Sequence, residues 1–214
     1  MPSFNLDLSI KESDDIIQKR MAGALKEQVG VYFKKAFDRV KGEIVSLVQS
    51  SIINSPEYES LSSGKLMAEF GLPDSDQRLL EILKFWEKLE IDYSSVKVKN
   101  NSLNGSFSLN MIRSDYSDVL ATTAAVFTTE KGTSLKWLEW LLLFGDKKII
   151  KDYNVVLGPS KRSRTGMAVM RGVISGKWGV PSEFSGTANN NWITRAIDSI
   201  DSKVEELLIA SLER

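Results

Sequence analysis

The stretch 14–53 constrains the fold most, because its apolar side chains recur every three or four residues over its whole length. This spacing is the period of one face of an α-helix. Ser13 is in position to cap such a helix, and Asp14 and Asp15 fall in its first turn, where the helix dipole favours acidic residues. The apolar stripe consists of Ile17, Met21, Ala24, Leu25, Val29, Phe33, Ala36, Phe37, Val40, Ile44, Leu47 and Val48. The pattern predicts a single long helix at the start of the chain.

A helix of this length extends for about 60 Å, because each residue adds about 1.5 Å. One domain of 214 residues is too small to cover that much apolar surface by itself. Part of the stripe is therefore expected to pack against another subunit. Gly23, Gly30 and Gly42 leave an alternative open, in which the stretch bends or breaks into two ordinary helices folded back on the core.

The rest of the chain contains shorter segments of both types. Ser55 followed by Pro56 indicates the start of a helix, and Asp74 with Gln77 has the spacing of a capping box. Apolar and polar residues alternate on both sides of the sequence NSLNG, which predicts a hairpin around it. Helices are expected at 56–61, 63–70, 75–90, 135–144 and 190–212, and strands at 93–100, 106–112, 148–158, 166–174 and 177–180.

Two boundaries need separate comment. Ser134 is expected to cap the helix at 135–144, and Gly145 to end it. Residues 119–132 combine Thr and Val with Ala, so a strand and a helix both remain open there.

Together these segments predict an α+β fold with a long N-terminal helix, a small antiparallel sheet and a C-terminal helix packed on the sheet. We expect a single domain, residues 1–214, with a helical insert at 56–92 and a basic loop region at 158–177.

Composition excludes several kinds of chemistry. The chain has no histidine and no cysteine, so a Ser-His-Asp triad, a thiolate nucleophile and a His/Cys zinc site are all impossible within it. Residues 158–166 are rich in Gly, Ser and Arg but lack the spacing of a phosphate-binding P-loop. We therefore expect no enzymatic activity, no cofactor and no metal, and the alternative that stays open is a hard-cation site built from carboxylates.

The N-terminal residues and the apolar runs bear on location. The first residues lack the basic start and apolar core of a signal peptide. The longest apolar run, 140–144, is far too short to cross a membrane. We expect no membrane partner, and we expect assembly in a cytoplasm-like compartment.

Charge is unevenly distributed along the chain. The formal net charge is zero, yet 151–177 holds six basic residues and one acidic residue. Such a segment is suited to contact an acidic protein surface or DNA phosphates. The alternative is a hairpin tip whose charges are simply solvated.

The tryptophans divide into two groups. Trp137 and Trp140 lie three residues apart on one face of the predicted helix, which favours the core. Trp178 and Trp192 fall at loop edges, where we expect interface anchors. Glu183 is expected to meet Arg162 or Arg164 of the same or a neighbouring chain.

Three short motifs resemble a known family in their order along the chain: Phe144-Gly145-Asp146, Arg164-Thr165-Gly166 and Trp192-Ile193-Thr194-Arg195-Ala196. An apolar helix ending in F-G-[TD], a basic loop with R-[ST]-G and a last helix after an aromatic loop are similar to those of head–tail joining proteins of tailed bacteriophages, the neck or tail-completion class. The resemblance is loose and covers much of the chain, from the long first helix to the last one. The 56–92 insert departs from the shorter family members.

The resemblance implies a structural virion protein of the phage neck that joins the portal and head to the tail as a ring subunit. It implies a homo-oligomeric ring, neighbouring portal or adaptor and tail proteins as partners, and packaged DNA passing through the channel. The expected location is the head–tail junction of the virion, after assembly in the host cytoplasm. The residues expected to contact a neighbour or the DNA are Lys161, Arg162, Arg164, Arg171, Lys177, Trp178, Glu183, Phe184, Trp192 and Arg195.

The alternative hypothesis is a DNA-binding or regulatory interaction module that uses the basic loop 158–177. It predicts salt-sensitive DNA binding by the single chain.

Overall fold

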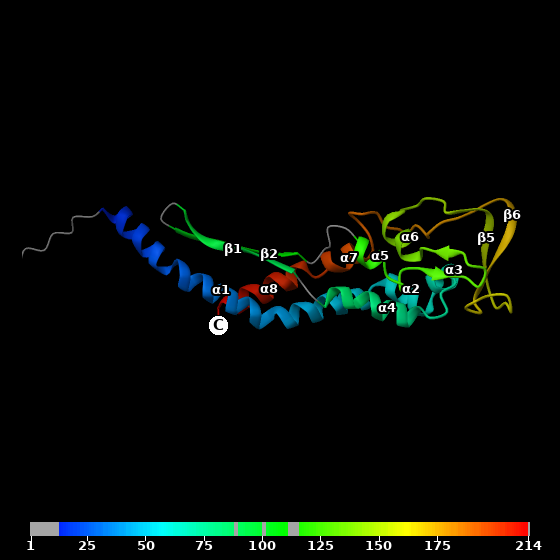
Figure 1. The fold of residues 1–214 in the computed structure, drawn as a ribbon, viewed down its shortest axis with the longest axis horizontal. Coiled ribbons are helices and arrows are strands. Elements are labelled where there is room, and N and C mark those ends of the chain that lie inside the picture. Colours follow the sequence, from blue (N-terminus) through cyan, green and yellow to red (C-terminus); the bar gives the residue numbers. More distant parts are fainter. Residues whose placement is uncertain (1–12, 88–89, 100–101, 111–115, 214) are drawn as a thin grey trace, which may run out of the picture.

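The computed structural model describes residues 13–87, 90–99, 102–110 and 116–213, and within 90–99 and 102–110 it describes the backbone. Among them, helices dominate and three small antiparallel hairpins complete the fold, which confirms the predicted α+β class (Figure 1).

Helix α1 (Asp14–Ile53) is one uninterrupted helix of 40 residues, so the predicted long helix is confirmed and the two-helix alternative is wrong. Gly23 and Gly42 do not break it, and open space surrounds both positions. Ser13 is the N-cap residue, but its side chain makes no capping hydrogen bond.

Burial along α1 is uneven. Its second half contributes a continuous buried stripe that includes Phe37, Ile44, Val48 and Ile52. In the stretch 14–33 only Ala22 is buried. The large apolar side chains exposed there are Ile16, Met21, Leu25, Val31 and Tyr32. The first half of α1 therefore extends beyond the main core, toward one end of the elongated molecule (Figure 1).

Short helices follow α1 and pack around its C-terminal end. They are α2 (Pro56–Ser63), α3 (Lys65–Phe70), α4 (Ser75–Leu83) and the 3₁₀ helix η1 (Lys84–Trp86). The Ser55 hydroxyl accepts a hydrogen bond from the Tyr58 amide at 3.2 Å, as expected of an N-cap. The predicted helix at 75–90 is too long, because the chain tightens to 3₁₀ geometry at Lys84. The predicted capping box does not form, since the Asp74 side chain makes no capping bond.

Each of the three sheets is a two-stranded antiparallel hairpin. Strands β1 (Glu90–Lys99) and β2 (Ser102–Asn110) confirm the first predicted hairpin, but Lys99 pairs with Ser102. Most of NSLNG therefore lies in β2, and the predicted turn position is wrong. Residues 100–101 lie outside the described part. Strands β3 (Phe127–Thr128) and β4 (Ser134–Leu135) form a second, minimal hairpin.

The third hairpin pairs β5 (Ile150–Leu157) with β6 (Ala168–Trp178). Its second strand joins the two predicted strands 166–174 and 177–180 into one. The basic loop 158–167 connects the two strands, as expected. This hairpin lies at the opposite end of the molecule from the start of α1 (Figure 1).

Two helices lie at either end of residues 119–132, the segment for which the sequence leaves both a strand and a helix open. Helix α5 (Ser117–Leu120) is followed by a turn and β3, so 119–132 contains both structure types. Helix α6 (Trp137–Leu143) begins after Lys136, and Ser134 lies in β4 instead of capping it. Gly145 follows α6 with φ of 60°, a left-handed conformation that glycine adopts without strain.

The predicted closing helix 190–212 is two helices, α7 (Trp192–Asp198) and α8 (Asp201–Leu212). Asn191 and Thr194 form a reciprocal capping box at the start of α7. Both helices pack against α1, not on a sheet as expected. The Tyr32 hydroxyl donates to the Leu212 carbonyl at 2.6 Å, and Arg39 Nη2 donates to the Ser211 carbonyl at 3.1 Å.

The buried apolar side chains form one cluster. It unites the second half of α1 with α2, α3, α4, α6, α7 and part of α8, and reaches the end of β6 at Trp178. The β5–β6 hairpin and the first half of α1 therefore project from one common core.

Candidate functional site

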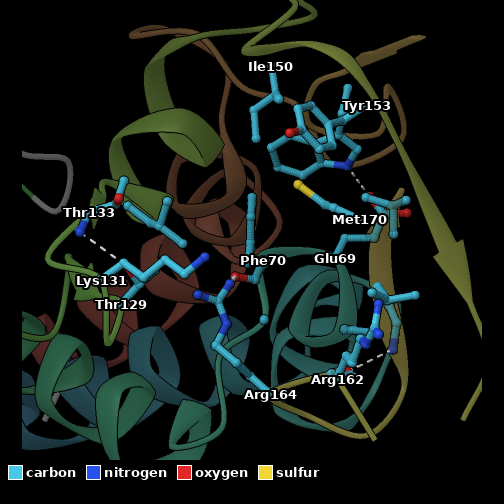
Figure 2. A pocket seen from close by; sticks show the side chains of 18 of the residues that line it. Glu69, Phe70, Thr129, Lys131, Thr133, Ile150, Tyr153, Arg162, Arg164 and Met170 are labelled. Atoms are coloured by element: carbon cyan, nitrogen blue, oxygen red, sulfur yellow. Dashed lines mark hydrogen bonds between the residues drawn. The ribbon is translucent and has the colours of Figure 1, made fainter. Parts of the chain in front are cut away.

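A groove of about 870 Å³ lies beside the β5–β6 hairpin. Its walls come from the end of α3, the β3–β4 turn, strands β5 and β6 and the basic loop (Figure 2). Helix α3 packs on both strands of the hairpin, which fixes the width of the groove.

Aromatic rings form the inner wall of this groove. The Phe70 and Trp178 rings meet edge to face at a centroid separation of 5.7 Å, and Trp140 meets Trp178 at 6.1 Å. Trp178 Nε1 donates a hydrogen bond of 2.9 Å to Glu69 Oε2. Trp178 is 6% exposed, so its predicted position at an exposed loop edge is wrong. It anchors the end of β6 in the core.

Arg164 fastens the basic loop to the rest of the chain. Its guanidinium lies over the Phe127 ring, 4.9 Å from the centroid, and its Nη2 donates to the Phe70 carbonyl at 3.2 Å. Desolvation by these neighbours lowers the pKa of the Arg164 guanidinium. The residue is exposed overall and lines the groove.

Gly71 makes this approach possible. It has φ of 64°, and a Cβ there would lie 2.5 Å from Arg164 Nη2. The left-handed backbone therefore favours glycine, and a Cβ would push the Arg164 guanidinium, the end of a flexible side chain, out of its place.

We expect Gly71→Ala to destabilise the chain by about 1–2 kcal/mol through backbone strain, and further by displacing Arg164. Urea unfolding measures the loss. Gly132→Ala is the matched control, since Gly132 also has positive φ, 79°, but open space around it. Equal losses in the two variants would show that the Arg164 contact adds nothing.

The rim of the groove is basic. Lys161 and Arg162 are exposed on the loop, and Lys131 reaches in from the β3–β4 turn toward Arg164 (Figure 2). Glu69 and Glu130 are the acidic lining residues. An anionic group lying over the aromatic wall would face the cations of the loop and the turn together. The arrangement is thus suited to an acidic segment of a partner or to a nucleic-acid backbone.

Lys131 and the groove itself were missed by sequence reasoning. The groove is assembled from 68–71, 129–135 and 150–178, and no local pattern links these segments. The structure brings together Lys161, Arg162 and Arg164 as predicted. It places Arg171 and Lys177 elsewhere on β6, exposed and outside the groove lining.

Glu69 is an acidic lining residue of the groove whose pKa is shifted by its surroundings. Burial raises the pKa of its carboxyl, while the hydrogen bond from Trp178 and the nearby Lys65 charge act in the opposite direction. Because the pKa is higher in the folded state, the protonated acid favours folding. That stability is present at low pH and is lost as the pH rises through the folded-state pKa.

Glu69→Gln is therefore expected to stabilise the chain at pH 7 and to change stability little below the ordinary glutamate pKa. The amide oxygen can still accept from Trp178 Nε1. Urea unfolding at a series of pH values tests this. Glu130→Gln, on the exposed turn, reports the effect of removing one negative charge from the rim. A Glu69→Gln variant less stable at pH 7 would contradict the argument.

The remaining predicted contact residues lie away from the groove lining. Glu183 pairs with Lys65, whose Nζ lies 2.8 Å from Glu183 Oε1, so its expected pairing with Arg162 or Arg164 is wrong within the chain. Phe184 is half-buried against the core.

Arg195 ties α7 to α2. Its Nη2 and Nε donate to Glu57 Oε1 at 2.6 and 3.1 Å, and the Glu57 side chain is only 4% exposed. Arg195 also donates to Asn190 Oδ1 and to the Phe184 and Ser185 carbonyls. Its guanidinium is thus engaged inside the chain, which points to a structural role.

Trp192 is fully buried. It starts α7, its ring tilts against Tyr58 at 6.4 Å, and its Nε1 donates to the Ser55 hydroxyl at 2.6 Å. The prediction of an interface anchor at a loop edge is therefore wrong for this residue. Trp137 is buried as predicted, and Trp140 is half-buried and faces the groove.

The described residues contain no group of three or more Asp or Glu side chains placed to hold a metal ion. None of their helices is both long and apolar enough to span a membrane.

Comparisons with protein-family models, curated proteins and solved structures gave no match.

Proposed function

We propose that this chain is a structural subunit of the phage neck, joining the portal and head to the tail as a member of a closed ring. The observation that carries the proposal is the first half of α1. Over 14–33 it exposes Ile16, Met21, Leu25 and Val31 at 45–59% of their surface. A helix with this much uncovered apolar surface, rigidly continuous with the core, is suited to packing between subunits.

The resembling motifs support the same proposal by shaping the chain. Gly145 ends α6 and its amide donates to the Gly186 carbonyl at 2.7 Å. Gly166 has φ of 77° in the basic loop, and Arg164 clamps that loop to α3. Trp192 fixes the start of α7. These four residues belong to the three motifs that carry the family resemblance.

The proposed partners are copies of the same chain, portal or adaptor and tail proteins, and DNA in the channel. The groove beside β5–β6 has the cations for an acidic face of a neighbour or for DNA phosphates. In this proposal the chain performs no catalysis, and its place is the head–tail junction of the virion.

Electron cryomicroscopy of intact particles tests the proposal. We expect a closed ring at the head–tail junction, with density that accepts the whole of α1 and the 158–177 region. The map also shows whether that region faces DNA or a neighbour. Absence of the chain from purified particles would reject the proposal.

A DNA-binding module remains the second candidate, because Lys161, Arg162, Arg171 and Lys177 are all exposed on one hairpin. It requires DNA binding by the single chain, with log K falling against log salt by about 0.9 per phosphate contact. The double variant Lys161→Glu, Arg162→Glu should then reduce this slope, and Lys19→Glu, Lys26→Glu on α1 should not. Binding that is absent at low salt would exclude this candidate.

A further inference from the structure

A highly exposed isoleucine protrudes from the β5–β6 hairpin, next to the exposed Val173. Ile174 is 95% exposed, the most exposed of the large apolar side chains in the described residues. It sits in a bulge: Lys151 pairs with Lys177 and Tyr153 pairs with Gly172. Residues 173–176 of β6 therefore lie opposite the single residue Asp152 of β5. A bulge of this kind redirects side chains out of the sheet surface.

The backbone of the bulge is held in an uncommon conformation. Asp152 and Ser175 have φ of 62° and 65°, and they are the non-glycine residues with positive φ in the described chain. At Gly176 a Cβ would lie 2.9 Å from Asn154 Oδ1 and 3.0 Å from the Tyr153 carbonyl oxygen. Two strained residues and a close backbone approach thus fix the display of Ile174. Strain of this kind concentrates at functional positions.

The surroundings of Ile174 are basic. Arg171 and Lys177 flank it on β6, and Lys151 pairs with Lys177 across the hairpin. Asp152 is the one acidic residue in the hairpin, so the bulge and its neighbours have a net positive charge. We call Ile174 with Lys151, Arg171 and Lys177 the hairpin knob.

A second surface has the complementary character. A groove of about 690 Å³ lies between α1 and α8, and its apolar lining comes from Gly42, Leu47, Leu207 and Ala210. Open space remains above Gly42, where a larger residue would have filled it. The charged lining residues are Glu43, Glu206 and Lys203. This α1–α8 groove therefore combines an apolar floor with an excess of negative charge.

We propose that the hairpin knob of one copy docks into the α1–α8 groove of the next copy. Ile174 would cover the apolar floor, and the basic residues around it would face Glu43 and Glu206. The knob cannot reach the groove of its own chain, because the hairpin lies at the far end of the molecule from α8 (Figure 1). The inference rests on the proposed ring-subunit function, to which it adds the contact between neighbours.

Docking of this kind is head-to-tail, because the two surfaces on each copy are different. Such a contact repeats from copy to copy and closes into a ring or continues as a filament. A symmetric dimer would instead bring the same surface of two copies together. The two outcomes are separable, because a head-to-tail contact can propagate and a symmetric one stops at two.

Engineered cysteines test the contact, since the chain has none of its own. The double variant Ile174→Cys, Ala210→Cys places one thiol on the knob and one in the groove. After mild oxidation of the purified protein, we expect a ladder of disulfide-linked multimers on a non-reducing gel. Each single variant should give at most a dimer. The control pair Ile174→Cys, Leu80→Cys uses another exposed apolar position, on α4, and should give no ladder.

Charge exchange tests the electrostatic part. We expect Arg171→Glu with Lys177→Glu to reduce the cysteine ladder at least tenfold. Adding Glu43→Lys and Glu206→Lys in the same chain should restore it. Circular dichroism and urea unfolding identify any variant that has lost its fold, and all these positions are exposed. If the exchanged charges did not restore the ladder, the proposed pairing of the basic knob residues with Glu43 and Glu206 would be rejected.

The proposal is overturned if the folded double-cysteine variant gives no ladder, gives only dimers, or gives the same ladder as the control pair. The ladder is measured on the purified protein, so its result does not depend on whether the chain is found in phage particles. A ladder from a chain that is absent from virions would support the contact and reject the neck function. A ring in phage particles that lacks a contact between knob and groove would support the neck function and reject the proposed contact.

Discussion

Replacing Trp192 by alanine is expected to destabilise the chain by about 3–5 kcal/mol, the range for removing a large aromatic side chain from a packed core. Trp192 is fully buried where α1, α2 and α7 meet. Its Nε1 donates to the Ser55 hydroxyl, which also donates to the Ile52 carbonyl at 2.7 Å and caps α2. The loss therefore combines a cavity with one lost hydrogen bond to the Ser55 hydroxyl at the junction of two helices.

Urea unfolding of three variants separates these effects. Trp192→Phe keeps part of the ring volume but loses the donor, and we expect it to be less destabilising than Trp192→Ala. Ser55→Ala removes the acceptor and the cap of α2 together, at a cost of about 1–2 kcal/mol. Trp140→Ala, at a half-buried tryptophan, is the control and should cost less than Trp192→Ala. If Trp192→Ala cost no more than Trp140→Ala, the anchoring role would be refuted.

Arg195→Met is expected to cost about 3–5 kcal/mol, because it leaves the Glu57 carboxylate buried without its cation. The Arg195 side chain is itself 36% exposed, whereas the Glu57 side chain is 4% exposed. Most of the loss therefore comes from the stranded carboxylate. The lower end of the range is expected, since solvent reaches the arginine side of the pair.

A double-mutant cycle tests this explanation. Glu57→Gln removes the charge that Arg195 neutralises, so Arg195→Met with Glu57→Gln should be more stable than the two single losses predict by addition. The coupling is measured by urea unfolding of the four proteins. Lys65→Met with Glu183→Gln is the control cycle, on an exposed pair at 43% and 51% side-chain exposure. Exposed pairs couple by about 1 kcal/mol or less, and a coupling no larger at Arg195 would contradict the argument.

The long helix was the element that the sequence pattern predicted best. Its apolar stripe keeps one period over the whole stretch, and Ile44, Val48 and Ile52 all lie on the buried face. The same pattern could not tell which half would be covered, because that depends on where α7 and α8 return along it. Gly23, Gly30 and Gly42 do not break the stretch into two helices, because a single exposed glycine lowers helix propensity by about 1 kcal/mol without ending a helix.

The C-terminal part shows where local patterns fail. No glycine or proline separates α7 from α8, and the apolar stripe continues through Ile197, Ile200 and Val204. Near the break the Ser51 hydroxyl of α1 donates to the Ala196 carbonyl, a contact that the local sequence does not reveal. For the same reason Trp178 and Trp192 were placed at loop edges, although partners distant in sequence, Glu69 and Ser55, bury them.

The candidate site was predicted in part. The basic loop was visible as a cluster of charge, and Lys161, Arg162 and Arg164 do lie on one groove. Its aromatic wall and Lys131 come from segments far away along the chain. The inward role of Arg164 depends on Phe70, Gly71 and Phe127, which only the fold brings to it.

The contact between α1 and α8 has a consequence for synthesis on the ribosome. Tyr32 and Arg39 bond to residues 180 and 172 positions later. The apolar stripe of α1 is therefore made well before α8 and gains its last cover only when α8 emerges. Until then α1 exposes a long apolar surface in the nascent chain, and this surface can bind other proteins or aggregate. Production of this protein should thus benefit from slow translation and from chaperones that hold extended apolar segments.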